Sequence, residues 1–105
     1  MLALSLALLL AGGSDDSARA QFTACLKTAY NKGNDQKIAA DSFAMFAKQV
    51  CAAQIQEFRS SVIGYDVKAG WTQKKAEPDA DSQVGDYLAD WSDRFRDKSS
   101  ITPSK

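Results

Sequence analysis

Apolar residues recur at helical spacing over three stretches of the chain, and polar residues fill the positions between them. The first stretch predicts a helix over residues 17–31, and the second predicts a long helix from about Asp41 to about Gly70. The third stretch, over residues 79–98, is the clearest, because one apolar stripe combines Val84, Tyr87, Leu88, Trp91 and Phe95. No stretch alternates in the manner of a strand, so the pattern predicts an all-α, three-helix bundle-like domain.

A cluster of turn-forming residues, 31–35, separates the first two predicted helices. Gly33 in this cluster is suited to the left-handed conformation that ends many helices. Asn34, Asp35 and Asp41 are all plausible N-caps for the second helix. We favour Asp41, because it places the two cysteines at more similar distances from the turn.

One glycine and one short segment bear on where the second predicted helix weakens and where the third begins. Gly64 lies inside the second helix and is either a weak point or the site of an early break, since glycine costs about 1 kcal/mol relative to alanine in a helix interior. Glu77-Pro78-Asp79 has the composition of a helix entrance, because proline is tolerated in the first turn and aspartate caps well.

The N-terminal residues have the pattern of a secretory leader. Residues 2–11 are apolar except for Ser5, and this run is about half the roughly 20 residues that a membrane-spanning helix needs. Small residues and the Ala18-Arg19-Ala20 site follow it, which is typical of a signal peptide, although the stretch before this site is long. The alternative is a short buried helix of the domain. We expect a periplasmic or secreted protein without an integral membrane segment in its mature form, divided into a signal peptide over 1–20, a helical domain over 21–98 and a flexible tail over 99–105.

The chain contains two cysteines, Cys25 and Cys51, one on each of the first two predicted helices. An even number of cysteines in a small exported chain indicates a disulfide, and a domain of this size often needs one. A redox-active pair is the alternative, but the spacing is unlike Cys-x-x-Cys. We therefore expect a structural disulfide that staples an antiparallel helix pair.

Composition and charge narrow the classes of function. Of 105 residues, 45% are hydrophobic and 25% are charged, and thirteen Lys and Arg balance thirteen Asp and Glu. A net charge of zero provides no overall field for nucleic acid. The absence of histidine removes the usual general base and the imidazole metal ligand. The charge is uneven, with eight basic against four acidic residues in 21–75 and two against seven in 76–97.

Carboxylates provide the other candidate chemistry. One face of the third predicted helix carries Asp86, Asp90, Asp93 and Asp97, but a helix holds them too far apart for one compact calcium site, so a solvated face is the simpler interpretation. Glu57 and Asp66 are about 13 Å apart along one helix, too far to cooperate directly. We expect no catalytic residues, no metal site and no cofactor.

Most aromatic residues, including Phe58 and Tyr65, fall at predicted core positions. Trp71 lies in a connector and either folds back over the core or contacts a partner. A long second helix is difficult to cover along its whole length. We therefore expect apolar surface near Phe58, Tyr65 and Trp71 to contact another protein or a second copy of this chain.

The chain resembles small exported bacterial proteins of unassigned function. The resemblance rests on the export pattern, on the two cysteines, and on the segments Cys51-Ala52-Ala53-Gln54-Ile55-Gln56-Glu57-Phe58-Arg59 and Asp86-Tyr87-Leu88-Ala89-Asp90-Trp91. In size, helicity and single disulfide the chain is also similar to periplasmic acid-stress chaperones of the HdeA type, an analogy of architecture. We expect a protein that acts by binding other proteins rather than by catalysis. The alternatives are a stress-protective chaperone-like protein and an immunity or inhibitor protein.

Overall fold

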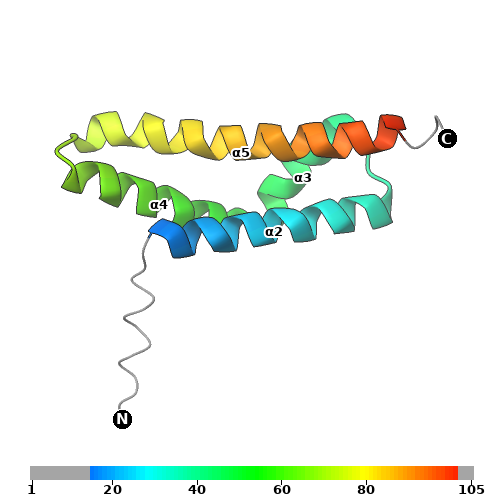
Figure 1. Cartoon of the computed structure of the whole chain (residues 1–105), viewed down its shortest axis with the longest axis horizontal. Helices are drawn as coiled ribbons and strands as arrows, with labels where there is room; N and C mark the ends of the chain where they lie inside the picture. Colours follow the sequence, from blue (N-terminus) through cyan, green and yellow to red (C-terminus); the bar gives the residue numbers. More distant parts are fainter. Residues whose placement is uncertain (1–14, 102–105) are drawn as a thin grey trace, which may run out of the picture.

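The computed structural model describes residues 15–101, and this part of the chain is helical apart from short connections (Figure 1). The elements in chain order are α2 (Asp15–Gln36), the 3-10 helix η1 (Ala40–Ser42), α3 (Phe43–Val50), α4 (Ala52–Lys68) and α5 (Gln73–Ile101). The all-α prediction is confirmed. Residues 1–14 of the predicted leader and 102–105 of the predicted tail lie outside the described residues.

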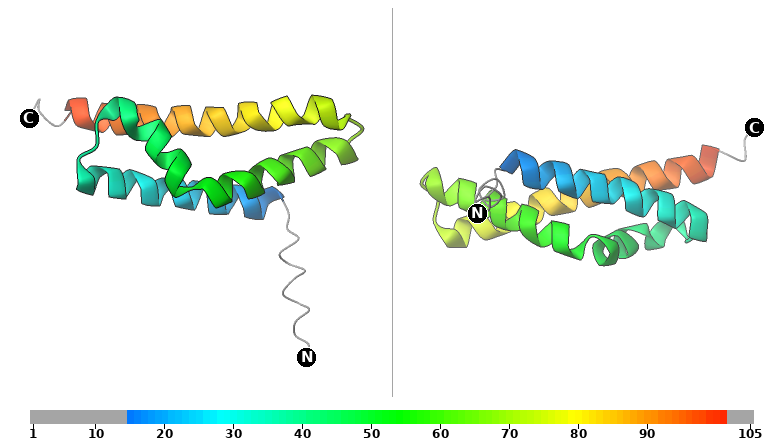
Figure 2. Two further views of the ribbon diagram at one scale, coloured as in Figure 1. Left: turned by 180° about the vertical axis from the view of Figure 1, so that it is seen from behind. Right: turned by 90° about the horizontal axis from the view of Figure 1, so that it is seen from below.

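α2 and α5 run along the length of the molecule, and α3 and α4 together form the third side (Figure 1). α3 crosses from α5 to α2, and α4 then runs back along α5, to which a tight turn joins it (Figure 2). α4 therefore packs against both long helices at one end of the molecule, and α3 packs against both at the other end.

The single long helix predicted from Asp41 to Gly70 is wrong, because the chain bends at Cys51. This residue leaves helical geometry, with φ −107° and ψ 23°, and separates α3 from α4. A straight helix of that length would extend about 43 Å and leave much of its apolar face uncovered. The bend lets two shorter helices each cover one end of the core, and α4 passes Gly64 without interruption.

The end of α2 also differs from the prediction. The helix continues past Gly33, and Lys37 adopts the left-handed conformation instead, with φ 55°. The N–H of Lys37 donates to the Asn34 carbonyl oxygen, and the N–H of Ile38 donates to that of Gly33, which is the Schellman arrangement. Gly33 is buried beneath Ile38 and Phe95, so its lack of a side chain serves close packing rather than a turn.

α5 is longer than predicted at both ends. It begins at Gln73 rather than 79, because the Thr72 hydroxyl accepts a hydrogen bond from the N–H of Lys75 at 3.1 Å and so caps the helix. Pro78 lies inside the helix instead of at its entrance. The C-terminal end is Ile101, so the predicted tail boundary at residue 98 falls within α5.

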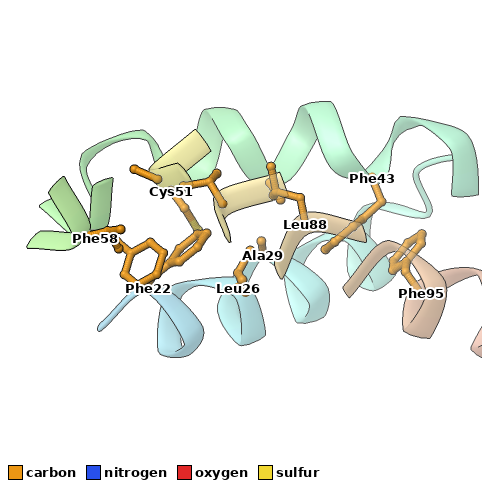
Figure 3. Packing of buried hydrophobic residues seen from close by; sticks show 12 residues of the cluster. Phe22, Leu26, Ala29, Phe43, Cys51, Phe58, Leu88 and Phe95 are labelled. Carbon is orange, nitrogen blue, oxygen red and sulfur yellow. The ribbon is translucent and has the colours of Figure 1, made fainter. Parts of the chain in front are cut away.

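The core has an aromatic group at each end and smaller side chains between them (Figure 3). At one end Phe22 contacts Phe58 and Tyr87, with ring centroids 5.3 and 5.4 Å apart. At the other end Phe43 stacks on Phe95 at 4.7 Å. The side chains between them include Leu26, Ala29, Ala47, Cys51 and Leu88.

Candidate functional site

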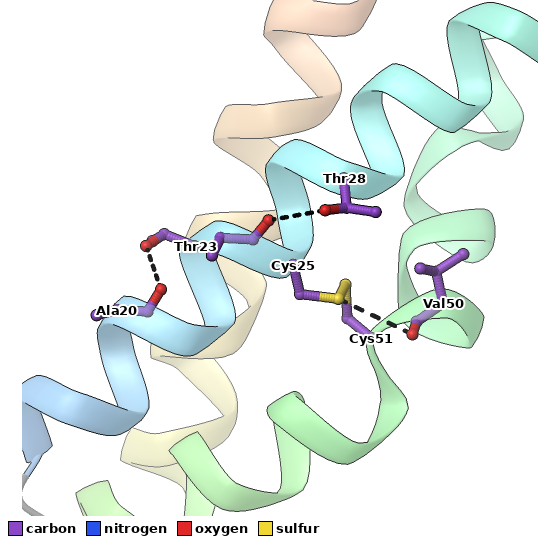
Figure 4. Close-up of a disulfide and its surroundings, with 7 residues drawn as sticks. Ala20, Thr23, Cys25, Thr28, Val50 and Cys51 are labelled. Carbon is purple, nitrogen blue, oxygen red and sulfur yellow. Dashed lines mark hydrogen bonds between the residues drawn. A yellow bond between two sulfur atoms is a disulfide. The ribbon is translucent and has the colours of Figure 1, made fainter.

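The predicted pairing of Cys25 with Cys51 is confirmed, since their sulfur atoms lie at bonding distance and their Cα atoms are 5.9 Å apart (Figure 4). The pair joins the middle of α2 to the bend between α3 and α4. Its role is therefore to hold both segments of the third side against α2 at the point where the backbone leaves helical geometry.

The turn between α4 and α5 is shaped by Gly70, whose φ of +107° suits glycine. The N–H of Gly70 donates to the Val67 carbonyl oxygen and the N–H of Trp71 donates to that of Asp66, both at 3.0 Å. These bonds satisfy carbonyl groups at the end of α4. Because Thr72 caps α5 directly afterwards, Trp71 is fixed between two capped helix ends rather than carried on a long loop.

Apolar side chains are exposed at this turn. Tyr65 is 65% exposed, Val67 is 43% exposed and Trp71 is 37% exposed. We call residues 65–75 the tip. It projects beyond the first turn of α2, so that α4 and α5 alone form this end of the described structure (Figures 1 and 2).

The tip is also basic. Residues 67–76 contain three lysines and no aspartate or glutamate, and Lys68, Lys74 and Lys75 are all exposed. The ammonium of Lys75 lies 4.8 Å from the centroid of the Trp71 ring, which is within cation-π range. The neighbouring carboxylate, Asp66, is only 7% exposed. The tip therefore presents positive charge around an aromatic ring.

The acidic residues lie further along α5, where arginines contact several of them. Arg59 Nε donates to Asp81 Oδ1 at 2.7 Å across the α4–α5 interface, and this hydrogen bond lowers the pKa of Asp81 and raises that of Arg59. Asp90 pairs with Arg94 within α5. These arginines compensate only part of the acidic charge, because residues 76–97 carry two basic against seven acidic residues.

The three predicted partner contacts have different positions in the structure. Trp71 and Tyr65 are exposed, as a contact surface requires, and Tyr65 is therefore not the core residue that its spacing indicated. Phe58 is fully buried against Phe22 and Tyr87, so its prediction as a partner contact is wrong. The cause is the bend, which turns the start of α4 into the core.

The structure also places the two carboxylates that were considered for acid–base chemistry. Glu57 is exposed and Asp66 is buried, so the structure does not bring them into one environment. Within residues 15–101 no group of three or more metal-ligating side chains is close enough to hold an ion. Over the same residues, no helix has the length and apolar content required to cross a membrane.

Sequence reasoning missed Val67 and the clustering of three lysines around Trp71. The basic cluster can be seen in the sequence, since residues 67–76 contain lysines and lack acidic side chains, but the net charge of the longer segment 21–75 does not reveal it. Met45, which is 63% exposed, was also missed; it belongs to α3, which lies away from the tip (Figure 1).

Comparison with known proteins provides no relative from which to transfer a function. No family model matches the chain, and neither a curated protein nor a solved structure matches it.

Proposed function

We propose that this chain is an exported, non-catalytic binding protein that contacts an acidic surface of a protein partner through the tip. The observation that carries the proposal is the exposure of Tyr65 and Trp71 among lysines at the end of a disulfide-stapled helical scaffold. Tryptophan and tyrosine dominate the binding energy of many protein interfaces.

Rigidity supports this role for Trp71. Its backbone is held by the bond to Asp66 on one side and by the Thr72 cap on the other. A contact residue that is already ordered loses little conformational entropy on binding, so more of its interaction energy appears as affinity.

Charge complementarity identifies the kind of partner. Three exposed lysines attract a carboxylate-rich surface and accelerate association. An extended polyanion such as nucleic acid fits less well, because residues 76–97 of α5 carry two basic against seven acidic residues and would repel it.

Site-specific photo-crosslinking tests the proposal. A photoreactive residue at position 65 should capture one discrete acidic protein in the exporting cell, whereas the same residue at position 45 should not, because Met45 is equally exposed but remote. Lys74→Glu with Lys75→Glu should abolish the capture, and the matched reversal Lys27→Glu with Lys48→Glu should leave it unchanged.

Three results would contradict the proposal. Equal capture from positions 65 and 45 would show that exposure alone is responsible. Capture that survives the tip charge reversal would remove the role of the lysines. Binding of the purified protein to vesicles of phosphatidylglycerol and phosphatidylethanolamine, with loss of binding on tip reversal, would assign the tip to an anionic bilayer instead.

A further inference from the structure

The first turns of α2 lie within the predicted leader, and their contacts bear on where this chain is processed. α2 begins at Asp15, so the predicted cleavage point after Ala20 falls inside the helix, more than one turn from its start. Ala18 is partly buried and packs against the core.

Arg19 makes the most specific of these contacts. Its Nη1 donates to the Tyr87 hydroxyl at 3.1 Å, and its guanidinium lies 5.5 Å from the centroid of the Phe58 ring. The Arg19 and Ala20 carbonyl oxygens both accept from the Thr23 hydroxyl, at 3.2 and 3.1 Å. These residues therefore complete one end of the core and join α2 to both α4 and α5.

Cleavage after Ala20 would remove this cover. Phe22, which is fully buried, would become the second residue of the chain. A signal peptide is removed and takes no part in the fold, which conflicts with the packing of Ala18 and Arg19.

A second small-residue site lies upstream. In Ala11-Gly12-Gly13-Ser14 the residues three and one before the Gly13–Ser14 bond are both small, and this site follows the apolar run directly. The sequence that would remain starts with Ser14, Asp15 and Asp16. Asp15 and Asp16 lie in the first turn of α2, where aspartates interact favourably with the helix dipole.

We infer that a leader peptidase cleaves this chain between Gly13 and Ser14. Water adds across that peptide bond, leaving the Gly13 carboxylate on the leader and a free α-amine on Ser14 of the mature protein. The inference rests on the export included in the proposed function, and it keeps all of α2 in the mature chain.

The test is the N-terminus of the full chain after export from a bacterial host, read by Edman sequencing and intact mass. Ser14 is the expected first residue. Gln21, or any other internal start, would overturn the inference while leaving export intact. An uncleaved chain beginning at Met1 would overturn both.

Two matched variants place the site independently. Gly13→Phe puts a bulky side chain next to the scissile bond and should block processing. Ala20→Phe changes an exposed position of α2 and should leave processing unchanged. The reverse pattern would assign the cut to Ala20.

Stability provides a further measurement that does not depend on the peptidase. Oxidised protein beginning at Ser14 should melt at a higher temperature than protein beginning at Gln21, and Arg19→Ala in the longer form should reproduce part of the decrease. Equal melting temperatures for the two forms would show that residues 14–20 do not contribute to the folded domain and would contradict the inference.

Discussion

Replacing Gly33 by alanine tests whether this glycine serves close packing. A Cβ atom at position 33 would lie 3.2 Å from Ile38 Cδ1 and 3.2 Å from Phe95 Cε1. Carbon atoms prefer separations of about 3.5–4.0 Å, so both neighbours would have to move. The Phe95 ring is 2% exposed and stacks on Phe43, which leaves it little room to retreat.

Two opposing effects set the size of the change. Overpacking a close-packed core costs about 1–3 kcal/mol. Alanine in place of glycine inside a helix recovers about 1 kcal/mol. Gly33→Ala should therefore lower the free energy of unfolding by about 1 kcal/mol, within a range of roughly 0–2 kcal/mol.

Gly64→Ala is the matched control. It makes the same chemical change inside α4, but its Cβ would meet no atom within 4 Å, so only the helix-propensity gain of about 1 kcal/mol remains. Urea unfolding followed by far-UV circular dichroism gives both free energies. Thermal melts should separate the variants in the same order, since about 1 kcal/mol corresponds to roughly 4–8 °C in a domain of this size.

Equal stabilisation by the two substitutions would contradict this prediction. That result would mean that Ile38 and Phe95 relax without cost and that Gly33 has no packing role. A loss of stability in Gly64→Ala would equally contradict the assignment of Gly64 to an open helix face.

The disulfide, the two tryptophans, Lys37 and Asp81 each allow a further measurement. Reducing the disulfide should lower the free energy of unfolding by roughly 3–4 kcal/mol in the chain-entropy model, measured by urea titration with and without reductant. Trp91→Ala should lower the free energy of unfolding by about 2–3 kcal/mol, because the ring is only partly buried, whereas Trp71→Ala should leave the melting temperature almost unchanged. The opposite result would mean that Trp71 belongs to the core and Trp91 to the surface. Lys37→Gly should raise stability by about 0.5–1 kcal/mol in the same titration, because residue 37 has a positive φ. Arg59 lowers the pKa of Asp81, so the ionised carboxylate contributes to the free energy of unfolding above about pH 4, and this contribution is lost as the pH falls through the lower pKa of the folded state. Between about pH 7 and about pH 2.5 the urea midpoint of Asp81→Asn should therefore fall less than that of the parent protein.

The features that sequence reasoning could predict are those that depend on local periodicity. The helical class, the apolar stripe that includes Leu88 and Phe95, and the pairing of Cys25 with Cys51 all follow from residue spacing, and the structure contains each of them. The end of the second helical stretch near Gly70 could also be predicted locally, since glycine favours the backbone conformation that ends α4.

The bend at Cys51 was not accessible, because it satisfies a tertiary requirement that no local signal records. The three residues that follow it are good helix formers. Hydrogen bonds of helical type continue on both sides, from the Cys51 N–H to the Ala47 carbonyl oxygen and from the Ile55 N–H to the Cys51 carbonyl oxygen. Two short helices bury more of the apolar core than one long helix only because of where α2 and α5 lie. Gly33 was misassigned for a similar reason, since a packing glycine and a turn glycine have the same local sequence.

The same reasoning explains the mixed result for the candidate site. Trp71 stood out because it lies between helices, and it is exposed. Tyr65 and Phe58 share a helical stripe and could not be separated by spacing, but the bend buries Phe58 while the projecting end of α4 leaves Tyr65 in solvent.

The position of the bend also determines how the molecule opens. Neither α3 nor α4 extends over both aromatic groups of the core, so each half can unfold locally while α2 and α5 remain joined through the other half. Amide hydrogens of α3 and of the second half of α4 should then exchange with solvent at independent rates. The disulfide lies at the boundary between these two cooperative units, where it tethers whichever segment detaches and shortens its search for the native position.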